Sequence, residues 1–230
     1  MAELLENSVF FAVFAGIAFY LLGDFLRKKL RIGFLNPLLV SVALTITLIV
    51  CLDIDYGKYS EGAKYLSYLL TPATVSLAIP LYRQLHALRG NTSAVFAGIL
   101  SGTAASLSCI YAMSAIFGLT HEEYVTMLPK SITTAIGMDV SEELGGNVSL
   151  TAAAIITTGI LGNAAGELVL RLFRIKEPAA KGVALGTAAH AIGTSKAMQL
   201  GDTEGAVSSL SLVVSGIITV AGASVFAAFM

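Results

Sequence analysis

Long stretches without any charged residue constrain this chain more than any other feature of its sequence. Six stretches contain no Asp, Glu, Lys or Arg: residues 7–23, 34–52, 65–82, 90–120, 147–166 and 205–230. A helix needs roughly 20 mostly apolar residues to cross a lipid bilayer, within a range of about 17–25. Each stretch is long enough, so the sequence predicts an all-α, polytopic membrane protein with about six full spans.

Composition excludes the common soluble classes of protein. Hydrophobic residues make up 56% of the chain and charged residues 13%, against roughly 25% charged residues in an ordinary soluble domain. A soluble globular enzyme of this size could not bury so much apolar surface, and a disordered chain would be far more polar. The net charge of −1 gives no basis for a nucleic-acid partner. The sequence lacks the signatures of hydrolases, phosphate-binding loops and zinc sites, so we expect no enzyme, no cofactor and no metal.

Basic residues orient the chain, because they accumulate in loops on the cytoplasmic side of a membrane. Two clusters, after the first and the fifth stretch, are expected to lie inside: Arg27, Lys28, Lys29 and Arg31, and Arg171, Arg174, Lys176 and Lys181. The first stretch then begins outside the cell, which predicts an outer N-terminus. Its N-terminal flank is acidic rather than basic, so we interpret it as a retained anchor and not as a signal peptide.

Two further segments, residues 123–146 and 182–204, are only half apolar. If both basic clusters lie inside, the first segment dips in from outside and returns, and by analogy the second dips in from inside. Two such re-entrant segments, each followed by a span, form an inverted repeat, which is the plan of many secondary transporters. The alternative is that both segments cross fully, giving eight spans with the second basic cluster outside. We predict one integral membrane domain over residues 1–230, with scaffold spans in 1–120 and two units of re-entrant segment plus span in 121–230.

Lys130 is the most informative charged residue, because it lies in the polar part of the first re-entrant segment. An ammonium group at membrane depth costs roughly 2.5–3.5 kcal/mol unless it is paired or hydrated. Ser131, Thr133 and Thr134 add hydroxyl groups and a helix start, a combination that suits a small anion such as a carboxylate. Alternatively, Lys130 reaches the membrane interface with its stem along apolar surface.

His190 occupies a corresponding place in the second segment, among small residues that let a ligand approach the backbone. It could bind substrate or carry a proton, or it could be a structural histidine bonded to a backbone carbonyl. The two segments together predict one substrate site near the middle of the membrane. Its predicted residues are Lys130, Ser131, Thr133, Thr134, His190, Gly193, Thr194 and Ser195.

Three prolines and two polar neighbours are candidates for helix breaks and gating. Asn36 and Pro37 open the second stretch as an ordinary cap and first-turn pair, although the amide could also face a cavity. Pro72 and Pro80 interrupt the third stretch and leave carbonyl groups that need other partners. Tyr82 ends that stretch, either as a gating residue or as an interfacial aromatic.

Glu204 and the two cysteines complete the residues of interest. Glu204 is most simply a solvated carboxylate at a helix start, and the sharper interpretation is a proton-coupling group. Cys51 and Cys109 lie inside apolar stretches, so we expect free thiols in the core and no disulfide.

Five motifs resemble those of the LrgB/CidB family of bacterial membrane proteins, in the same order and over nearly the whole chain. They are Leu35-Asn36-Pro37-Leu38-Leu39, residues 70–82 (LTPATVSLAIPLY), Leu128-Pro129-Lys130-Ser131-Ile132-Thr133-Thr134, residues 186–194 (GTAAHAIGT) and Glu204-Gly205-Ala206. One motif departs from the family pattern, which usually continues with Pro-Ile-Ala-Met where this chain has Ala135-Ile136-Gly137-Met138. We therefore expect Gly137 rather than a proline to make the helix break.

The resemblance implies two competing functions. Some family members are described as holin-like or antiholin-like modulators of murein hydrolase activity and autolysis. Others, and the related plastidial glycolate/glycerate translocator of plants, move small monocarboxylates such as glycolate, glycerate or pyruvate. The resemblance also implies the bacterial inner membrane and a small membrane partner of the LrgA/CidA type.

The anion-binding interpretation of Lys130 agrees with the second of these functions. We therefore expect a secondary transporter of small 2-hydroxy or 2-oxo monocarboxylates, with a holin-like or antiholin-like lysis protein as the alternative. By analogy with other transporters, we expect a homo-oligomer, most simply a dimer.

Overall fold

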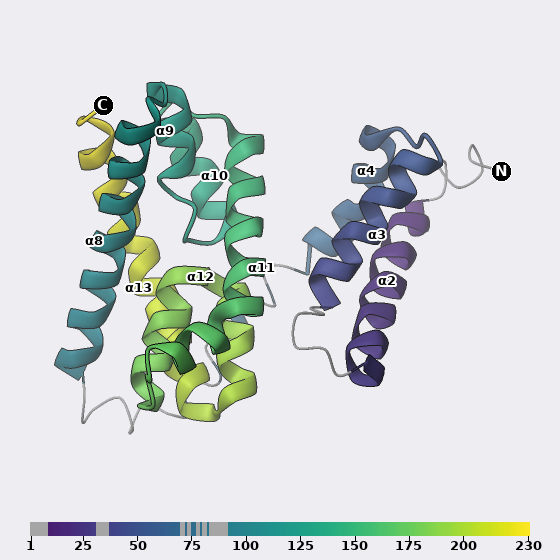
Figure 1. Cartoon of the computed structure of the whole chain (residues 1–230). Helices are drawn as coiled ribbons and strands as arrows, with labels where there is room; N and C mark the ends of the chain where they lie inside the picture. Colours follow the sequence, from purple (N-terminus) through teal and green to yellow (C-terminus); the bar gives the residue numbers. More distant parts are fainter. Residues whose placement is uncertain are drawn as a thin grey trace. The chain divides into compact units, whose positions relative to one another are not determined.

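The structure is a computed structural model that describes residues 9–30, 37–69, 72, 75, 76, 79, 82 and 92–230. Within these ranges every regular element is a helix, which confirms the predicted all-α class. The helices are α2 (Val9–Leu30), α3 (Pro37–Cys51), α4 (Tyr56–Ser67), α8 (Thr92–Phe117), α9 (His121–Met127), α10 (Thr134–Glu143), α11 (Val148–Leu172), α12 (Pro178–Leu200) and α13 (Asp202–Ala227) (Figure 1).

Four of the described helices are long and apolar enough to cross a bilayer, namely α2, α8, α11 and α13. Only 17–39% of the most apolar stretch of each is buried inside the protein. Such apolar surface is stable when lipid covers it, which agrees with a polytopic membrane protein. α3 has 15 residues and is shorter than the charge-free stretch 34–52. Eight of the 18 residues at 65–82 lie outside the described ranges, so the total of six spans stays a prediction.

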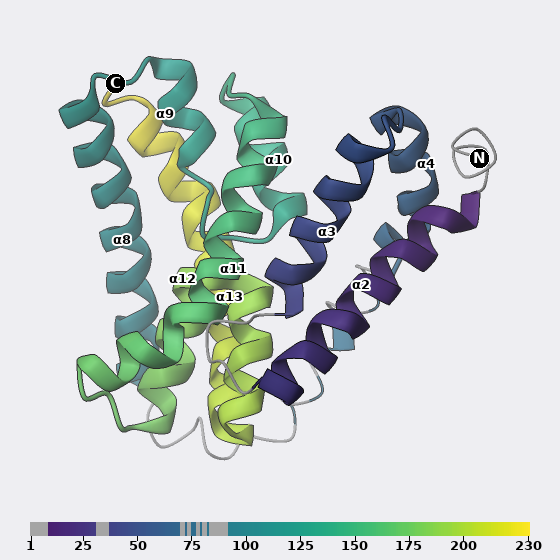
Figure 2. The same ribbon diagram turned by 45° about the vertical axis from the view of Figure 1, so that its right-hand side comes forward.

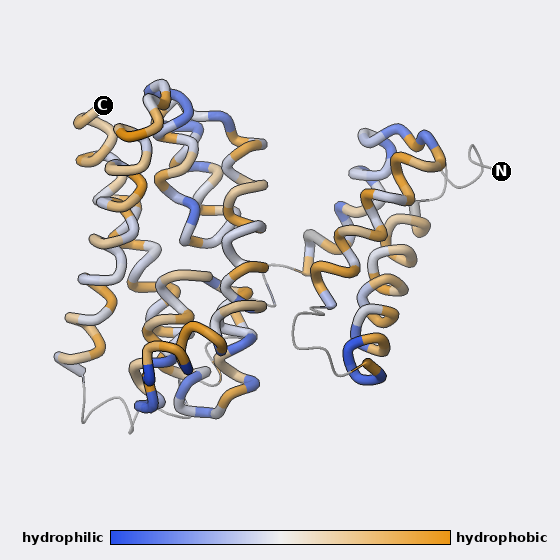
Figure 3. Tube along the Cα trace, viewed as in Figure 1, coloured by the Kyte–Doolittle hydropathy of each residue, from blue (hydrophilic) through white to orange (hydrophobic). Residues whose placement is uncertain are grey.

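The hydropathy pattern and the cysteines both show apolar residues facing outward. The strongly hydrophilic residues gather mainly at helix ends and in the connections (Figure 3). Cys51 at the end of α3 and Cys109 on α8 are free thiols, as predicted, but both are exposed rather than in the core. The prediction equated apolar neighbours with burial, whereas the outer face of a membrane helix is apolar and faces lipid.

Residues 1–76 form one compact unit, in which α2 packs against α3 and α4. Gly23 of α2 allows the start of α3 to come close, because a Cβ atom at Gly23 would lie 2.8 Å from the carbonyl oxygen of Pro37. Pro37, a predicted gating residue, is the buried first residue of α3. α4 begins after Asp55, whose side chain accepts a hydrogen bond from the backbone N–H of Lys58 at 3.0 Å.

Residues 77–230 form the second unit, whose described helices are α8 to α13. α12 packs most extensively on α13, and it also contacts α8 and α11. Near the start of α8, Val95 and Ile99 pack with Val207 of α13. Near its end, Leu107 packs with Tyr124 of α9, whose hydroxyl donates a hydrogen bond to the carbonyl oxygen of Phe226 at 2.9 Å.

Two chain reversals distinguish the second unit, and they enter from opposite ends (Figures 1 and 2). α9 runs inward from the end where α8 finishes, and α10 returns to that end before α11 crosses. α12 runs inward from the end where α11 finishes, breaks at residues 189–190 and returns before α13 crosses. This agrees with the predicted pair of oppositely entering re-entrant segments, each followed by a span.

A capping box starts α9. The backbone N–H and the hydroxyl of Thr120 donate to the Glu123 carboxylate at 2.8 and 2.9 Å, and the Glu123 N–H donates to the Thr120 hydroxyl at 3.3 Å. These bonds hold the pKa of the exposed Glu123 carboxyl below its ordinary value of 4.5. Since the folded-state pKa is lowered, the stabilisation is present above the unfolded-state pKa and is lost as the pH falls through the folded-state value.

We expect Glu123→Gln to remove this part of the pH dependence of stability. The wild type should lose thermal stability when the pH is lowered below about 4.5, and the variant should lose less over the same interval. Thermal unfolding midpoints of the two proteins in detergent, at about pH 6 and about pH 4, measure the difference. An equal drop in both proteins would mean that other carboxyl groups account for it.

Candidate functional site

Lys130 lies in the turn that separates α9 from α10. Its side chain is half-buried, and its Nζ donates a hydrogen bond to the Ser131 hydroxyl at 3.0 Å. The Ser131 oxygen in turn lies 3.2 Å from the hydroxyl oxygen of Ser106 on α8. An ammonium group has three N–H donors, and within the described part of the chain one of them bonds to protein. The others are available to a small anion.

Thr133 and Thr134 start α10, as the sequence predicts for a helix beginning at this turn. Thr133 is the N-cap residue with extended backbone, and its hydroxyl makes no capping hydrogen bond. Gly137 does not make the break, contrary to expectation, because it lies inside α10. A Cβ atom there would collide with Cδ1 of Ile155, so Gly137 instead lets α10 pack closely on α11.

His190 lies at the break in α12. Its backbone has φ 42° and ψ −138°, a combination that a residue with a Cβ atom rarely adopts. The side chain is 3% exposed, and Nε2 lies 2.9 Å from the carbonyl oxygen of Ile155. Because a carbonyl oxygen only accepts, Nε2 carries the proton, and Nδ1 of the neutral ring is an acceptor. The structural alternative and the functional one both fit this geometry, since Nε2 bonds to the Ile155 carbonyl and Nδ1 bonds to no residue that the structure describes.

The break divides α12 into a first arm, residues 178–189, and a second arm, residues 191–200, and the residues after His190 pack the second arm against the first arm and against α13. The Thr194 hydroxyl donates to the carbonyl oxygen of His190 at 3.0 Å and lies 2.9 Å from the Ser208 hydroxyl on α13. A Cβ atom at Gly193 would collide with the carbonyl oxygen of Leu185 on the first arm. Ser195 is exposed. Gly193 and Thr194 therefore have packing roles, whatever they contribute to a ligand.

Ile155 of α11 joins the two broken segments. Its carbonyl oxygen lies against the His190 ring, and its side chain lies against Gly137 of α10. The structure thus brings the Lys130 segment and the His190 segment to the same turn of one span. Sequence reasoning did not single out Ile155, since nothing in its local pattern separates it from the other apolar residues of α11.

Glu204 lies in the first turn of α13, three residues after Gly201. The prediction of a solvated carboxylate at this helix start is wrong, because the side chain is nearly buried. Its side chain is 9% exposed, and its carboxylate lies 3.5 Å from Nζ of Lys181, which is 26% exposed. The ion pair joins the first arm of α12 to α13. Its geometry agrees with a structural tie, and a coupling role for Glu204 stays a prediction.

A second ion pair, between Lys196 and Glu167, was not predicted from the sequence. Nζ of Lys196, only 12% exposed, lies 2.9 Å from the carboxylate of Glu167, which also pairs with Arg171. The pair joins the second arm of α12 to the end of α11. A usable signal existed, because Glu167 directly follows a charge-free stretch and Lys196 lies in a half-apolar segment, where each charge calls for a partner.

Some of the gating candidates are outside the residues that the structure describes. Asn36 and Pro80 are outside the described residues, while Pro72 and Tyr82 are described and exposed. Their gating role stays a prediction.

The fold and the contacts at Ile155 together define the class of protein. It is an all-helical membrane protein in which two broken helices enter from opposite ends and meet on one spanning helix.

Comparison with known proteins gives the family. The LrgB-like family model matches residues 16–229, and the chain belongs to this family. It is similar to "Holin-like protein CidB" of Staphylococcus aureus, with 34% identity over 203 residues that cover 88% of this chain and 89% of the relative. It is also similar to "Antiholin-like protein LrgB" of Bacillus subtilis, with 34% identity over 220 residues and 95% of both chains covered. No solved structure matches the chain.

Proposed function

We propose that this chain is a holin-like or antiholin-like protein of the bacterial inner membrane that takes part in the control of autolysis. The names of its relatives carry this proposal, since both CidB and LrgB proteins match it over most of its length. Control of lysis requires a partner or an assembly that changes membrane permeability. A small membrane protein of the LrgA/CidA type and a homo-oligomer, most simply a dimer, belong to the same proposal.

A second candidate function, at the molecular level, is secondary transport of a small 2-hydroxy or 2-oxo monocarboxylate. The observation that favours it is the meeting of two broken helices on Ile155, one next to Lys130 and the other at His190. Broken helices with polar groups at mid-membrane are the usual substrate sites of secondary transporters. A half-buried ammonium group with N–H donors left over suits the binding of a small anion.

The residues have distinct tasks in this second function. Lys130 supplies the positive charge for a carboxylate, and the hydroxyl groups of Thr133 and Thr134 lie at the adjacent helix start. Nδ1 of His190 can accept a hydrogen bond from a 2-hydroxyl group or take up a proton. The two functions are compatible, because carboxylate flux alters the energy state of the membrane and so can influence autolysis.

Uptake by liposomes separates the two functions. The purified full chain is reconstituted and tested for uptake of labelled glycolate and pyruvate, with and without a pH gradient, and for release of a trapped dye too large for a transporter. A transporter gives saturable uptake and retains the dye. A holin-like pore releases the dye, with a steep dependence on the number of chains per vesicle. If the chain alone does neither, the assay is repeated with an LrgA/CidA-type partner.

Lys130→Met tests the transport site within this assay. We expect saturable uptake to fall at least tenfold, since loss of one charge-assisted contact to a carboxylate costs about 1.5–3 kcal/mol. Lys28→Met, which removes an exposed lysine at the end of α2, is the matched control and should retain uptake. Unchanged uptake by Lys130→Met would exclude Lys130 from the substrate site.

A further inference from the structure

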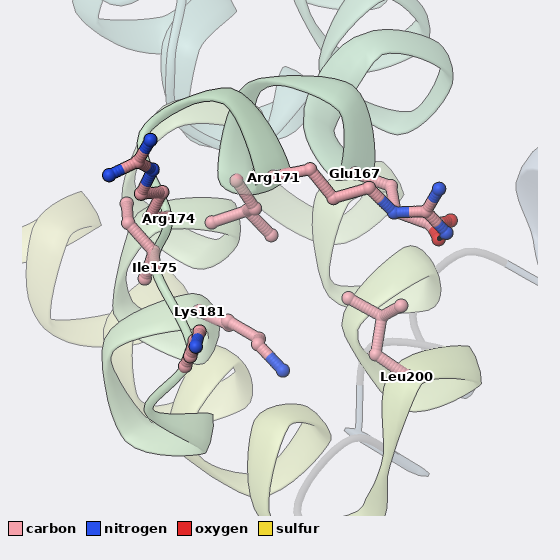
Figure 4. A pocket seen from close by; sticks show the side chains of 8 residues that line it. Glu167, Arg171, Arg174, Ile175, Lys181 and Leu200 are labelled. Atoms are coloured by element: carbon pink, nitrogen blue, oxygen red, sulfur yellow. Dashed lines mark hydrogen bonds and ion pairs between the residues drawn. The ribbon is translucent and has the colours of Figure 1, made fainter.

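A basic pocket lies where α11 ends and α12 begins, away from the broken helices' meeting point at Ile155. It has a volume of about 340 Å³. Four basic side chains and one carboxylate line it together with Leu170, Ile175 and Leu200. Figure 4 shows Arg174, Ile175 and Lys181 on one side of this pocket and Glu167, Arg171 and Leu200 on the other. The same basic residues orient the chain in the membrane.

Positive charge remains in the pocket after its ion pairs are counted. Glu167, the carboxylate in the lining, is already bonded to both Lys196 and Arg171. Lys181 pairs with Glu204. Arg174 and Lys176 make no ion pair and no side-chain hydrogen bond with any described residue, and both are exposed. The pocket therefore offers unpaired cations to an anion.

The backbone at Arg174 adds an independent observation. α11 ends in a Schellman motif, in which the N–H of Ile175 bonds to the carbonyl of Leu170 at 2.9 Å and the N–H of Arg174 to that of Arg171 at 3.0 Å. Arg174 has φ 55°, the left-handed conformation that this position of the motif imposes. Glycine is the residue usually found there, because a Cβ atom is strained in that conformation. Folding alone thus favours glycine, and an arginine at this position points to use of its guanidinium group.

The surroundings point to a lipid rather than to a free anion. The pocket lies at the end of a spanning helix whose last turns expose Leu168, Leu172 and Phe173 by 59%, 74% and 70%. A lipid whose headgroup occupies the pocket can lay its acyl chains along these residues. Basic residues at this end are expected to face the cytoplasmic leaflet, which is rich in anionic lipids.

We propose that this pocket binds the phosphate group of an anionic phospholipid, with Arg174 and Lys176 as its unpaired cations and the last turns of α11 as the acyl-chain surface. The site ties the α11–α12 junction, from which the broken helix α12 starts, to the lipid of one leaflet. It goes beyond the proposed function, since it requires neither transport nor lysis activity.

Arg174→Gly is the decisive variant, because it removes the cation while relieving the backbone. Thermal unfolding midpoints of the full chain are measured in micelles containing phosphatidylglycerol or, at the same mole fraction, phosphatidylcholine. We expect the variant to gain about 2–4 °C in phosphatidylcholine from the relieved strain. The extra stabilisation that phosphatidylglycerol gives to the wild type should fall by half or more, because a ligand stabilises only a site that it binds.

Two comparisons make the result specific. Lys28→Gln removes one exposed cation at the end of α2 and should keep the full phosphatidylglycerol effect. Lys176→Gln changes no strained backbone and should lose part of the phosphatidylglycerol effect. This variant tests the proposal if Arg174→Gly gives no folded protein. An unchanged phosphatidylglycerol effect in Arg174→Gly and Lys176→Gln overturns the proposal. Equal stabilisation of the wild type by inorganic phosphate in phosphatidylcholine micelles would also overturn it, since the ligand would then be a free anion.

Discussion

Gly193→Ala is expected to lower the stability of the protein strongly, because the added methyl group meets atoms that cannot move aside. A Cβ atom at Gly193 would collide with the carbonyl oxygen of Leu185 and would lie 2.7 Å from Cβ of Ala189. Both contacts are with the first arm of α12, and neither a carbonyl oxygen nor an alanine Cβ can turn aside. The two arms must therefore separate, and we expect a cost of about 3 kcal/mol, the upper end of the range for overpacked cores.

Gly166→Ala is the matched control for this variant. A Cβ atom at Gly166 on α11 would also meet Leu185, but at the Cδ2 end of its flexible side chain, at 2.7 Å. Leu185 can turn this end away, and alanine favours the helix over glycine, so the net change should stay within about 1 kcal/mol. Thermal unfolding followed by circular dichroism in detergent compares the two variants. Similar midpoints for both would show that the arms of α12 are not tightly joined at Gly193.

At Gly193 the sequence indicates the broken segment of the chain but not the neighbour that packs against the glycine. The sequence indicates a polar, small-residue segment at residues 182–204, and the structure has a broken helix there. Sequence reasoning assigned the glycine to a ligand, because a missing side chain leaves room for one. In the structure that room is filled by the backbone of Leu185. Only three-dimensional packing decides which neighbour occupies the space above a glycine.

The overall arrangement was more predictable than the site, for a physical reason. Charge-free stretches and basic clusters report the two strongest constraints on a membrane chain, which are the cost of a charge in lipid and the bias of positive charge to one side. They predicted the two re-entrant segments and their opposite directions. Apolar length alone did not settle the span at 34–52, where α3 covers 15 residues.

The hydroxyl contacts inside the second unit were not predictable. The Thr151 hydroxyl on α11 donates to the carbonyl oxygen of Thr126 at 2.9 Å and lies 2.6 Å from the Ser141 hydroxyl oxygen, and so ties α9 and α10 to the span that follows them. Serine and threonine occur throughout this sequence, and either can bond to its own helix or across to another. Lys130 and His190 stood out because their types are rare and costly in lipid, whereas a threonine gives no such signal.

His190→Ala and His190→Gly are expected to differ in stability, although both remove the same ring. Each loses the bond to the Ile155 carbonyl and the contact with Gly159, where a Cβ atom would lie 2.7 Å from the ring. Alanine keeps a Cβ atom at φ 42°, whereas glycine adopts this conformation without strain. Relief of about 1–3 kcal/mol of strain outweighs the cost of about 0.4–1 kcal/mol for the more flexible unfolded chain. The glycine variant should therefore unfold about 2–4 °C higher than the alanine variant.

Liposome uptake by the same pair separates a histidine that acts on substrate from one that only shapes the break. If Nδ1 contacts the substrate or takes up its proton, both variants lose uptake, and the more stable glycine variant gains nothing. If His190 only shapes α12, His190→Gly should keep most of the wild-type uptake while His190→Ala loses more. An alanine variant as stable as the glycine variant would contradict the strain at residue 190. The break in α12 would then be imposed by the packing of Gly193 and Thr194 and not by an unfavourable backbone held in place at His190.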